Sequence, residues 1–430
     1  MLCVKERDNL KPALIYHADL WGTRESKYTD LFETAVDRTR WTKLKPQSSF
    51  YLFVPQDTGL RTKYELGWKI TEAMPINVLG FQTHRDHFAV DFDKANLFNR
   101  FSEFRSTDLG DSEIRTKFDI KDNRDWKIHE ARSRLLADKN WQTLLIRCAY
   151  RPFDFRFCYF SEAAMDYPRR ELVAHMLGKD NVALNITRQT KADTWQNAVV
   201  SDKPTPALFV ELKDGSNVFP LYLYPETISE LGLHKDRRPN LSQGFLKILA
   251  EKLRLSQEEP HGLPKGITPE DIFHYAYAVF HSPTYRARYA EFLKIDFPRL
   301  PLTSSLKLFR ALASKGAELV ALHLMESPKL NDFITEFPPK GDNIVEKVQY
   351  TDKDKRVWIN KAQYFSGVPK AVWEFHVGGY QVCEKWLKDR KGRKLSYEDI
   401  QHYQKIVVAL KETIRLMAEI DKLIPSWPII

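Results

Sequence analysis

Three residues near the middle of the chain have the types and spacing of a nuclease site. Asp202 is followed by Glu211 and Lys213, an order with which many nucleases hold a divalent metal and orient a water molecule. The segment ALFVELKDG, which carries Glu211 and Lys213, is predicted to be a strand. Such a short pattern often arises by chance in a chain with 29% charged residues. A structural role is therefore the favoured interpretation, and a metal-dependent nuclease is the alternative.

A second polar cluster, Thr83 to His87, precedes an alternating segment, 88–93, that predicts a strand. His84 and His87 are three residues apart with carboxylates nearby, which fits a metal site. Without further ligands at fixed spacing, a hydrogen-bonded turn is the favoured interpretation. A contact to nucleic acid is a third possibility, and Arg85 suits it better than it suits a metal.

The Tyr150–Tyr224 stretch combines strand-like alternation with arginines at predicted strand ends and turns. Arg188 and Gln189 have the donors that bridge guanine and adenine edges, whereas Thr and Lys side chains reach phosphates. Arg169 and Arg170 suit phosphate anchoring or a salt bridge to Glu171 or Asp166. For each single arginine of this stretch a partly buried ion pair and a DNA contact are both open. Arg151, beside Asp154, is favoured as a structural residue, and Arg156 is a further candidate for holding the sheet together. The residues predicted to contact DNA are Arg188, Gln189, Thr187, Lys191, Arg169, Arg170, Arg85 and His84.

A basic run near the C-terminus is a second candidate phosphate surface, although such runs are commonly solvated faces. Its members are Lys385, Lys388, Arg390, Lys391, Arg393 and Lys394. The whole chain has 66 Lys and Arg against 57 Asp and Glu, a net charge of +9 that leans toward a polyanionic partner.

Several classes of site are not expected in this chain. It contains no GxxxxGK[ST], GxGxxG, GxSxG or HExxH motif. The four cysteines show no CxxC spacing, which indicates free thiols of a reducing compartment. No apolar run approaches the roughly 20 residues that span a bilayer, and the N-terminal residues are charged. We therefore expect a cytoplasmic protein without a membrane partner, and no catalytic, metal or cofactor site.

Hydrophobic patterning predicts an α+β fold: a mixed or antiparallel β-rich domain with a helical subdomain and a long C-terminal helix. One helix of the subdomain has Thr268 as N-cap and Pro269 at its first position. The final helix has Ser396 as N-cap and Asp399 as its capping-box partner. Other predicted elements are strands at 13–22 and 50–55, a hairpin over 344–361, and helices at 26–36, within 94–146, at 282–295 and at 303–325.

The apolar residues of the final helix form a seam for packing on another helix. A core-facing helix and a dimeric coiled coil both fit this pattern, and a protein-binding adaptor built on the helix is a further alternative. The seam consists of Ile400, Tyr403, Val407, Leu410, Ile414 and Met417.

Long segments of the chain, in order from Ala13 onward, resemble the C-terminal part of type ISP restriction–modification enzymes, which are related to type I and type IIG systems. The segments include YRPFDFRFCYF, DYPRREL, NITRQT, FPLYLYP, DIFHYAYAVFHSPTYRARYAEFLKIDFPRLPL and GGYQVCEKWLKDRKGRKLSYEDIQHYQKIVVAL. In that family one polypeptide carries a nuclease, a motor, an adenine-N6 methyltransferase and a target recognition domain. The resemblance implies that this chain recognises a DNA sequence and positions the duplex for the methyltransferase.

The resemblance also implies a domain division. Residues 1–45 would be the last strand and helix of the methyltransferase, whose body is absent, and 46–239 the β-rich recognition core. A helical insertion at 240–330, a hairpin returning to the core at 331–375 and a C-terminal helical element at 376–430 would follow.

The catalytic motif NPP[YF] of the family is missing from the chain. We therefore expect the chain by itself to bind without catalysing. S-adenosylmethionine, ATP and Mg²⁺ would belong to the full-length family members. The expected partners are double-stranded DNA and the methyltransferase, motor and nuclease domains of the same or a split polypeptide.

Overall fold

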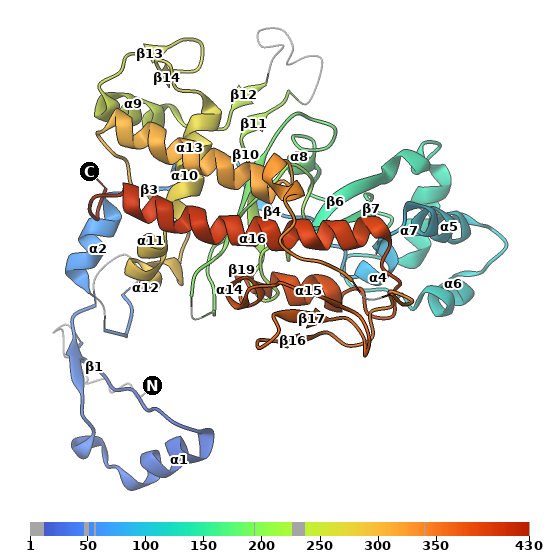
Figure 1. Ribbon diagram of the computed structural model, residues 1–430, viewed down its shortest axis with the longest axis horizontal. Coiled ribbons are helices and arrows are strands. Elements are labelled where there is room, and N and C mark those ends of the chain that lie inside the picture. Colours follow the sequence, from blue (N-terminus) through green and yellow to red (C-terminus); the bar gives the residue numbers. More distant parts are fainter. Residues whose placement is uncertain are drawn as a thin grey trace, which may run out of the picture. The chain divides into compact units, whose positions relative to one another are not determined.

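A computed structural model of the chain describes residues 13–46, 51–55, 57–192, 194–225, 237–338 and 340–429 (Figure 1). The chain divides into two units, Met1–Lys63 and Tyr64–Ile430. The finer division predicted at residues 239, 330 and 375 lies within the second unit and stays a prediction. Mixed helices and small antiparallel sheets confirm the α+β class.

The described part of the first unit is a two-stranded sheet whose connection contains a helix. Strand β1 (Ile15–His17) pairs antiparallel with β2 (Thr42–Leu44). Between them lie α1 (Arg24–Glu33), none of whose residues is buried, and a 3-10 turn, η1 (Val36–Arg38). The strand predicted over 50–55 is wrong for its described part: residues 51–55 form no strand, and Tyr51 has a φ of 47°. Phe50 lies outside the described residues.

A four-stranded antiparallel sheet in the order β4-β10-β8-β9 organises the second unit. Its strands are β4 (Val78–Leu79), β8 (Ala183–Thr187), β9 (Ala198–Ser201) and β10 (Ser216–Pro220). Thr187 lies opposite Ser216, and Leu79 lies opposite Asn217. Strands β4 and β8 therefore end at the same end of the sheet, the one at which β10 begins.

A second sheet, in the order β5-β7-β6, carries helices and a large aromatic core. Its strands are β5 (Val90–Asp91), β6 (Leu145–Arg151) and β7 (Asp154–Tyr159). Figure 1 shows α5 (Lys94–Arg105), α6 (Asp111–Phe118) and α7 (Ile128–Ala137) grouped beside β6 and β7. The strand predicted from Phe88 is wrong at its start, because Asp86–Ala89 forms a helical turn, α4, that buries Phe88 against Phe101 and Phe104.

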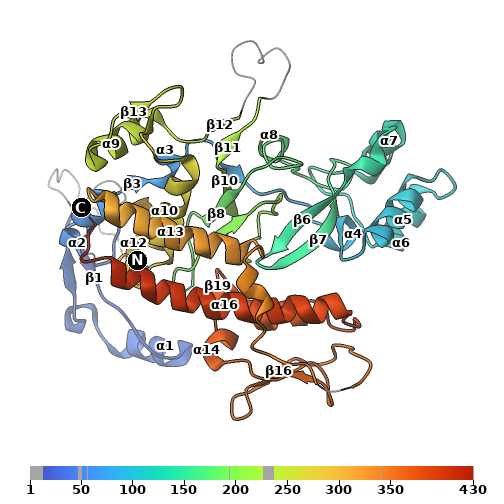
Figure 2. The ribbon, with the colours of Figure 1, turned by 45° about the horizontal axis from the view of Figure 1, so that its top comes forward.

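The long C-terminal helix α16 (Tyr397–Leu423) lies beside α13 (Leu306–His323) in both Figure 1 and Figure 2. The predicted caps Thr268 and Ser396 are present, each in a capping box. Tyr403, Val407 and Leu410 of α16 are buried within this chain, which favours the core-facing interpretation of the seam. The other helices of this region are α9 (Gln243–Leu253), α10 (Pro269–His281), α11 (Pro283–Arg288) and α12 (Ala290–Leu293), the last two replacing the single helix predicted at 282–295.

Short elements complete the second unit. The predicted hairpin over 344–361 is confirmed as β16 (Gln349–Thr351) and β17 (Arg356–Trp358). Within the described residues no helix is long and apolar enough to cross a membrane. The remaining elements are α2 (Thr58–Glu65), which spans the unit boundary, β3 (Trp68–Lys69), α3 (Ile70–Ala73), η2 (Trp141–Leu144), α8 (Arg170–Val173), β11 (Tyr222–Leu223), β12 (Arg238–Pro239), β13 (Gln257–Glu258), β14 (Leu263–Pro264), β15 (Arg299–Leu300), η4 (Pro328–Asn331), β18 (Tyr364–Phe365), α14 (Lys370–Trp373), β19 (His376–Val377), β20 (Tyr380–Gln381) and α15 (Val382–Lys388).

Candidate functional site

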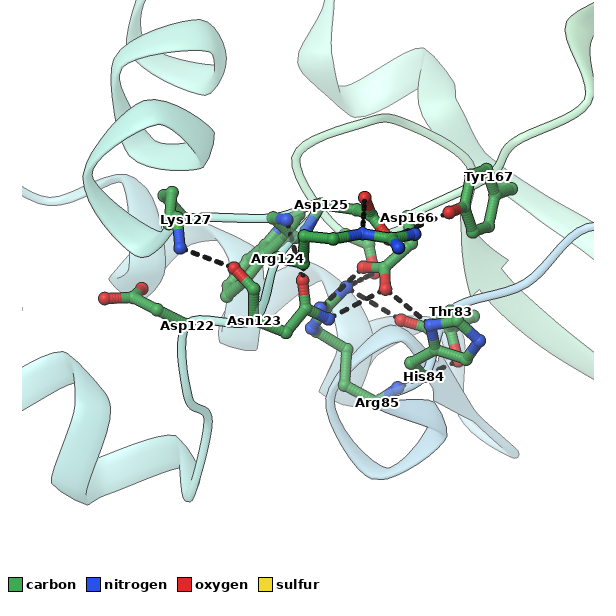
Figure 3. Close-up of polar contacts among 12 residues, drawn as sticks. Thr83, His84, Arg85, Asp122, Asn123, Arg124, Asp125, Lys127, Asp166 and Tyr167 are labelled. Atoms are coloured by element: carbon green, nitrogen blue, oxygen red, sulfur yellow. Dashed lines mark hydrogen bonds and ion pairs between the residues drawn. The ribbon is translucent and has the colours of Figure 1, made fainter.

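The buried carboxylate of Asp166 is the centre of a polar network built from three distant segments (Figure 3). Its Oδ2 atom lies 2.5 Å from His84 Nδ1 and accepts a hydrogen bond of 2.8 Å from Asn123 Nδ2. Its Oδ1 atom lies 2.6 Å from Arg85 Nη2. Because one carboxylate holds all three groups, the segments that carry them are fixed relative to one another.

Arg85 supports this network from below the surface. Its side chain is 4% exposed, and its guanidinium lies 3.8 Å from the ring centre of Trp126. Nη1 also donates to the backbone oxygen of Thr83 at 2.7 Å. The pKa of Arg85 lies below its ordinary value, because burial lowers it by more than the hydrogen bond and charge of Asp166 raise it. The predicted DNA contact by Arg85 is therefore wrong: its guanidinium is enclosed and holds the turn that presents His84.

The loop before α7 is fixed by the side chain of Asn123. Its Oδ1 atom accepts hydrogen bonds from the backbone N–H groups of Asp125, at 2.8 Å, and Trp126, at 2.7 Å. This is the local turn that Asn favours in loops. Helix α7 begins only at Ile128, so the residues before it form a loop that these hydrogen bonds hold.

Arg124 projects from this loop with its side chain 85% exposed. Its Nε and Nη2 atoms donate to the two carboxylate oxygens of Asp125, at 2.8 and 3.0 Å. The Tyr167 hydroxyl donates to Asp125 Oδ2 at 2.8 Å. The hydrogen bonds from Arg124 and Tyr167 lower the pKa of Asp125. None of these residues was predicted to contact DNA, although Asn and Asp clustered just before a helix were a signal for such a turn.

Of the predicted residues, His84 belongs to this network, Arg169 contacts Tyr167, and Arg170 follows Arg169 at the start of α8. His84 is 53% exposed and packs edge-on against Tyr167 at 6.1 Å. The guanidinium carbon of Arg169 lies over the ring of the same tyrosine, 5.1 Å from its centre. His84 and Arg169 have φ angles of 52° and 55°, a conformation that non-glycine residues adopt at a cost and often at functional sites. Arg170, at the start of α8, is exposed and pairs with Glu162 at 3.7 Å.

The second group of predicted residues directly follows β8, at the end of the sheet where β4 also ends. Arg188 is 66% exposed, and its Nε atom donates to Asp296 Oδ1 at 3.2 Å. Gln189 Nε2 donates to Asp214 Oδ1 at 3.2 Å. Lys191 is exposed. These three side chains are accessible to a ligand, and two of them are oriented by carboxylates.

Thr187, by contrast, is fully buried. The DNA contact predicted for it is therefore wrong. Its Oγ1 atom accepts a hydrogen bond of 2.8 Å from Asn197 Nδ2. It is the last residue of β8, a strand in which all five residues are buried. Thr187 therefore anchors the strand from which Arg188 emerges.

The nuclease-like carboxylates have structural partners. Glu211 is buried and accepts hydrogen bonds from Thr190, at 2.8 Å, and Asn197, at 2.7 Å. Asp202 forms an ion pair with the lysine that follows it. The strand predicted over 207–215 is wrong, because a turn closes from Phe209 N–H to Pro206 oxygen. Lys213 is exposed. Among the described residues, no group of three or more His, Cys, Asp or Glu side chains is placed to hold a metal ion.

Asp154 joins the β6–β7 hairpin to the C-terminal region. Its carboxylate accepts hydrogen bonds from Arg156, at 2.7 Å, and from the buried Arg390, at 2.9 Å. Arg156 also reaches Asp389 at 3.0 Å. Of the two roles open for Arg156, the structural one agrees with these contacts. In the basic run, Arg390 is therefore internal, whereas Lys391, Arg393 and Lys394 are exposed.

Solved structures share this fold. A complex of DrdV with DNA is 22% identical, with a TM-score of 0.69, over 92% of this chain and 42% of that chain. A nuclease-deletion mutant of the Type ISP restriction–modification enzyme LlaGI with a DNA substrate mimic is 19% identical, with a TM-score of 0.66, over 94% and 33%. The ATP-dependent Type ISP enzyme LlaBIII bound to DNA is 18% identical, with a TM-score of 0.67, over 92% and 27%.

This chain thus spans less than half the length of each of these proteins. At such identities the likeness establishes the fold. No curated protein matches the sequence. A family model described as the Type ISP C-terminal specificity domain matches residues 72–419, which include every residue of the two groups above. The chain therefore belongs to the Type ISP C-terminal specificity domain family.

Proposed function

We propose that this chain recognises a sequence in double-stranded DNA as the specificity part of a restriction–modification enzyme. Membership of the specificity-domain family over residues 72–419 is the observation that carries the proposal. The solved structures of similar fold, which contain DNA, support it. The net charge of +9 supplies a general attraction to the phosphate backbone.

The exposed residues divide into two roles. Arg188 and Gln189 have directional donors oriented by Asp296 and Asp214, which suits hydrogen bonding to base edges in the major groove. Lys191 is a flexible charge that suits a phosphate. The proposed contact surface also includes His84 and Arg169, which contact Tyr167, and the neighbouring Arg170. Affinity would come mainly from phosphates and sequence preference from the bases.

The chemistry would take place outside this chain. The duplex would be held for an adenine-N6 methyltransferase, with a coupled motor and nuclease, and S-adenosylmethionine, ATP and Mg²⁺ would serve those domains in the cytoplasm. We assign 1–45 to the end of the methyltransferase. Trp21 and Phe32 are 81% and 88% exposed, which supports packing of this segment against the rest of a methyltransferase domain.

Direct binding of duplex DNA tests the proposal. The purified chain would be titrated against a labelled random 30-base-pair duplex over a salt series, and bound sequences would be selected from a randomised library. We expect the logarithm of the affinity to fall linearly with the logarithm of the salt concentration, and one sequence to be enriched. Absence of both at low salt would contradict the proposal.

A cleavage assay on the same duplexes tests the nuclease alternative. We expect the wild type and Glu211→Gln to behave alike, without Mg²⁺-dependent cleavage of the duplex. Cleavage that depends on Glu211 would favour a nuclease over a recognition domain.

A further inference from the structure

We infer that Arg124 is a base-reading residue of the specificity domain and that its target is a guanine in the major groove. The inference rests on the proposed DNA recognition. It concerns a residue in a loop between α6 and α7, distant in sequence from Arg188 and Gln189.

The hydrogen-bonding capacity of Arg124 fits a guanine. A guanidinium has five N–H donors in a planar fork. Two of them, one on Nε and one on Nη2, donate to Asp125. The remaining donors, on Nη1 and Nη2, form an adjacent pair that points away from Asp125. Such a pair matches the O6 and N7 acceptors that guanine presents in the major groove.

A continuous set of hydrogen bonds supports Arg124 from the surface down to the core. Asp125, which holds the guanidinium, is itself held by the Tyr167 hydroxyl at 2.8 Å. The backbone beside it is fixed by Asn123, whose side chain donates to the buried Asp166. Figure 3 shows these groups in one continuous network. A side chain ordered before binding loses less conformational entropy on binding, which favours a directional contact.

The charge balance favours a base over a phosphate. The carboxylate of Asp125 neutralises the guanidinium locally, so the pair exerts little net attraction on the phosphate backbone. The carboxylate would also repel a phosphate that approached the same edge. The directed donors of Arg124 remain, and directed donors discriminate between base pairs. Arg124 therefore has the properties of a reader, whereas Lys191 has those of a phosphate contact.

The test compares the sequence preference and salt dependence of the full chain with those of Arg124→Ala and Arg124→Lys. Sequences would be selected from one randomised duplex library, and affinities measured for the selected site and for single-base changes. We expect both variants to lose preference for guanine at one position, with affinity for the selected site falling about tenfold to hundredfold. The salt slope and the other positions should be unchanged. Lysine should not rescue, because it lacks the planar fork.

Other outcomes separate the alternatives. A uniform loss on all sequences, a salt slope reduced by about one and rescue by lysine would identify a phosphate contact and overturn the inference. Unchanged preference and affinity in both variants would also overturn it, while wild-type selection would leave the proposed function intact. Failure of the wild type to bind any duplex would instead contradict the proposed function itself. Arg134→Ala is the control, because Arg134 is another exposed arginine paired with glutamates.

Discussion

Arg85 and Asp166 form an ion pair of 2.6 Å in which both side chains are buried. Removing one partner of such a pair leaves an uncompensated buried charge. We expect Asp166→Asn to lower the free energy of unfolding by about 3 kcal/mol, measured by urea denaturation. Asp180→Asn is the control, because Asp180 pairs with Arg237 at the surface and its loss should cost at most about 1 kcal/mol. Equal effects of the two substitutions would contradict the structural importance of Asp166.

The two kinds of DNA contact proposed after β8 should respond differently to mutation. Arg188→Ala should remove preference at one base pair, with about a tenfold to hundredfold loss for the selected site. Lys191→Ala should weaken binding to all sequences and reduce the salt slope by about one. Lys411→Ala, on the exposed side of α16, should change neither property. Competition binding with matched and mismatched duplexes measures both effects, and identical behaviour of the first two variants would refute the assignment.

The buried pair His281 and His323 should make the second unit sensitive to acid. Burial, and then the positive charge of Arg286, lower the pKa of His323 to about 3, and the same causes lower the pKa of His281. The unfolded chain binds these protons near pH 6.5, so the contribution to stability is present above that pH and is lost as the pH falls toward 3. Between pH 7.5 and 5, His323 alone should account for about 2 kcal/mol of lost unfolding free energy.

Urea denaturation at the two pH values measures this loss. His129→Gln, at a histidine whose side chain is 83% exposed, is the control for the loss of a histidine as such. The His323→Gln variant should show a weaker dependence on pH than the wild type. An equally steep dependence in that variant would contradict the assignment to His323.

Gly316 in α13 allows a close approach to α10. A Cβ atom at this position would overlap the backbone oxygen of His274. We expect Gly316→Ala to destabilise the protein by about 2 kcal/mol or more, although alanine favours a helix by about 1 kcal/mol. Gly244 in α9 is the matched control, since its Cβ would lie 3.8 Å from the Trp68 ring and Gly244→Ala should be neutral or stabilising. The midpoint temperature of thermal unfolding should therefore fall in Gly316→Ala and stay unchanged or rise in Gly244→Ala.

Local signals in the sequence predicted the parts of the fold that depend on local interactions. The helices after Thr268 and Ser396 begin where their caps indicate, because a cap satisfies N–H groups within its own first turn. Arg188 and Gln189 are exposed, as expected from their place after a strand. Alternation was misleading at Phe88, where burial against two other phenylalanines accompanies a helical turn instead of a strand.

The Asp166 network could not be predicted from the sequence, because its partners are distant in the chain. His84 and Asn123 are 82 and 43 positions away from Asp166. No local pattern specifies which of the many carboxylates they meet. The same reason explains the errors at Arg85 and Thr187: each belongs to a polar segment, and only tertiary packing determines that its side chain is enclosed.

The bonds from Arg156 and Arg390 to Asp154 limit how this domain can be engineered. A chimera that exchanged only residues 64–239 with a relative would carry the hairpin and leave behind Arg390, which lies 236 positions from Asp154 in the sequence. Transplanted Asp154 would then lie, in a buried position, against whichever residue the relative has in place of Arg390. Grafts intended to change the target sequence should therefore transfer the hairpin together with the segment around α15, or exchange the exposed loops alone.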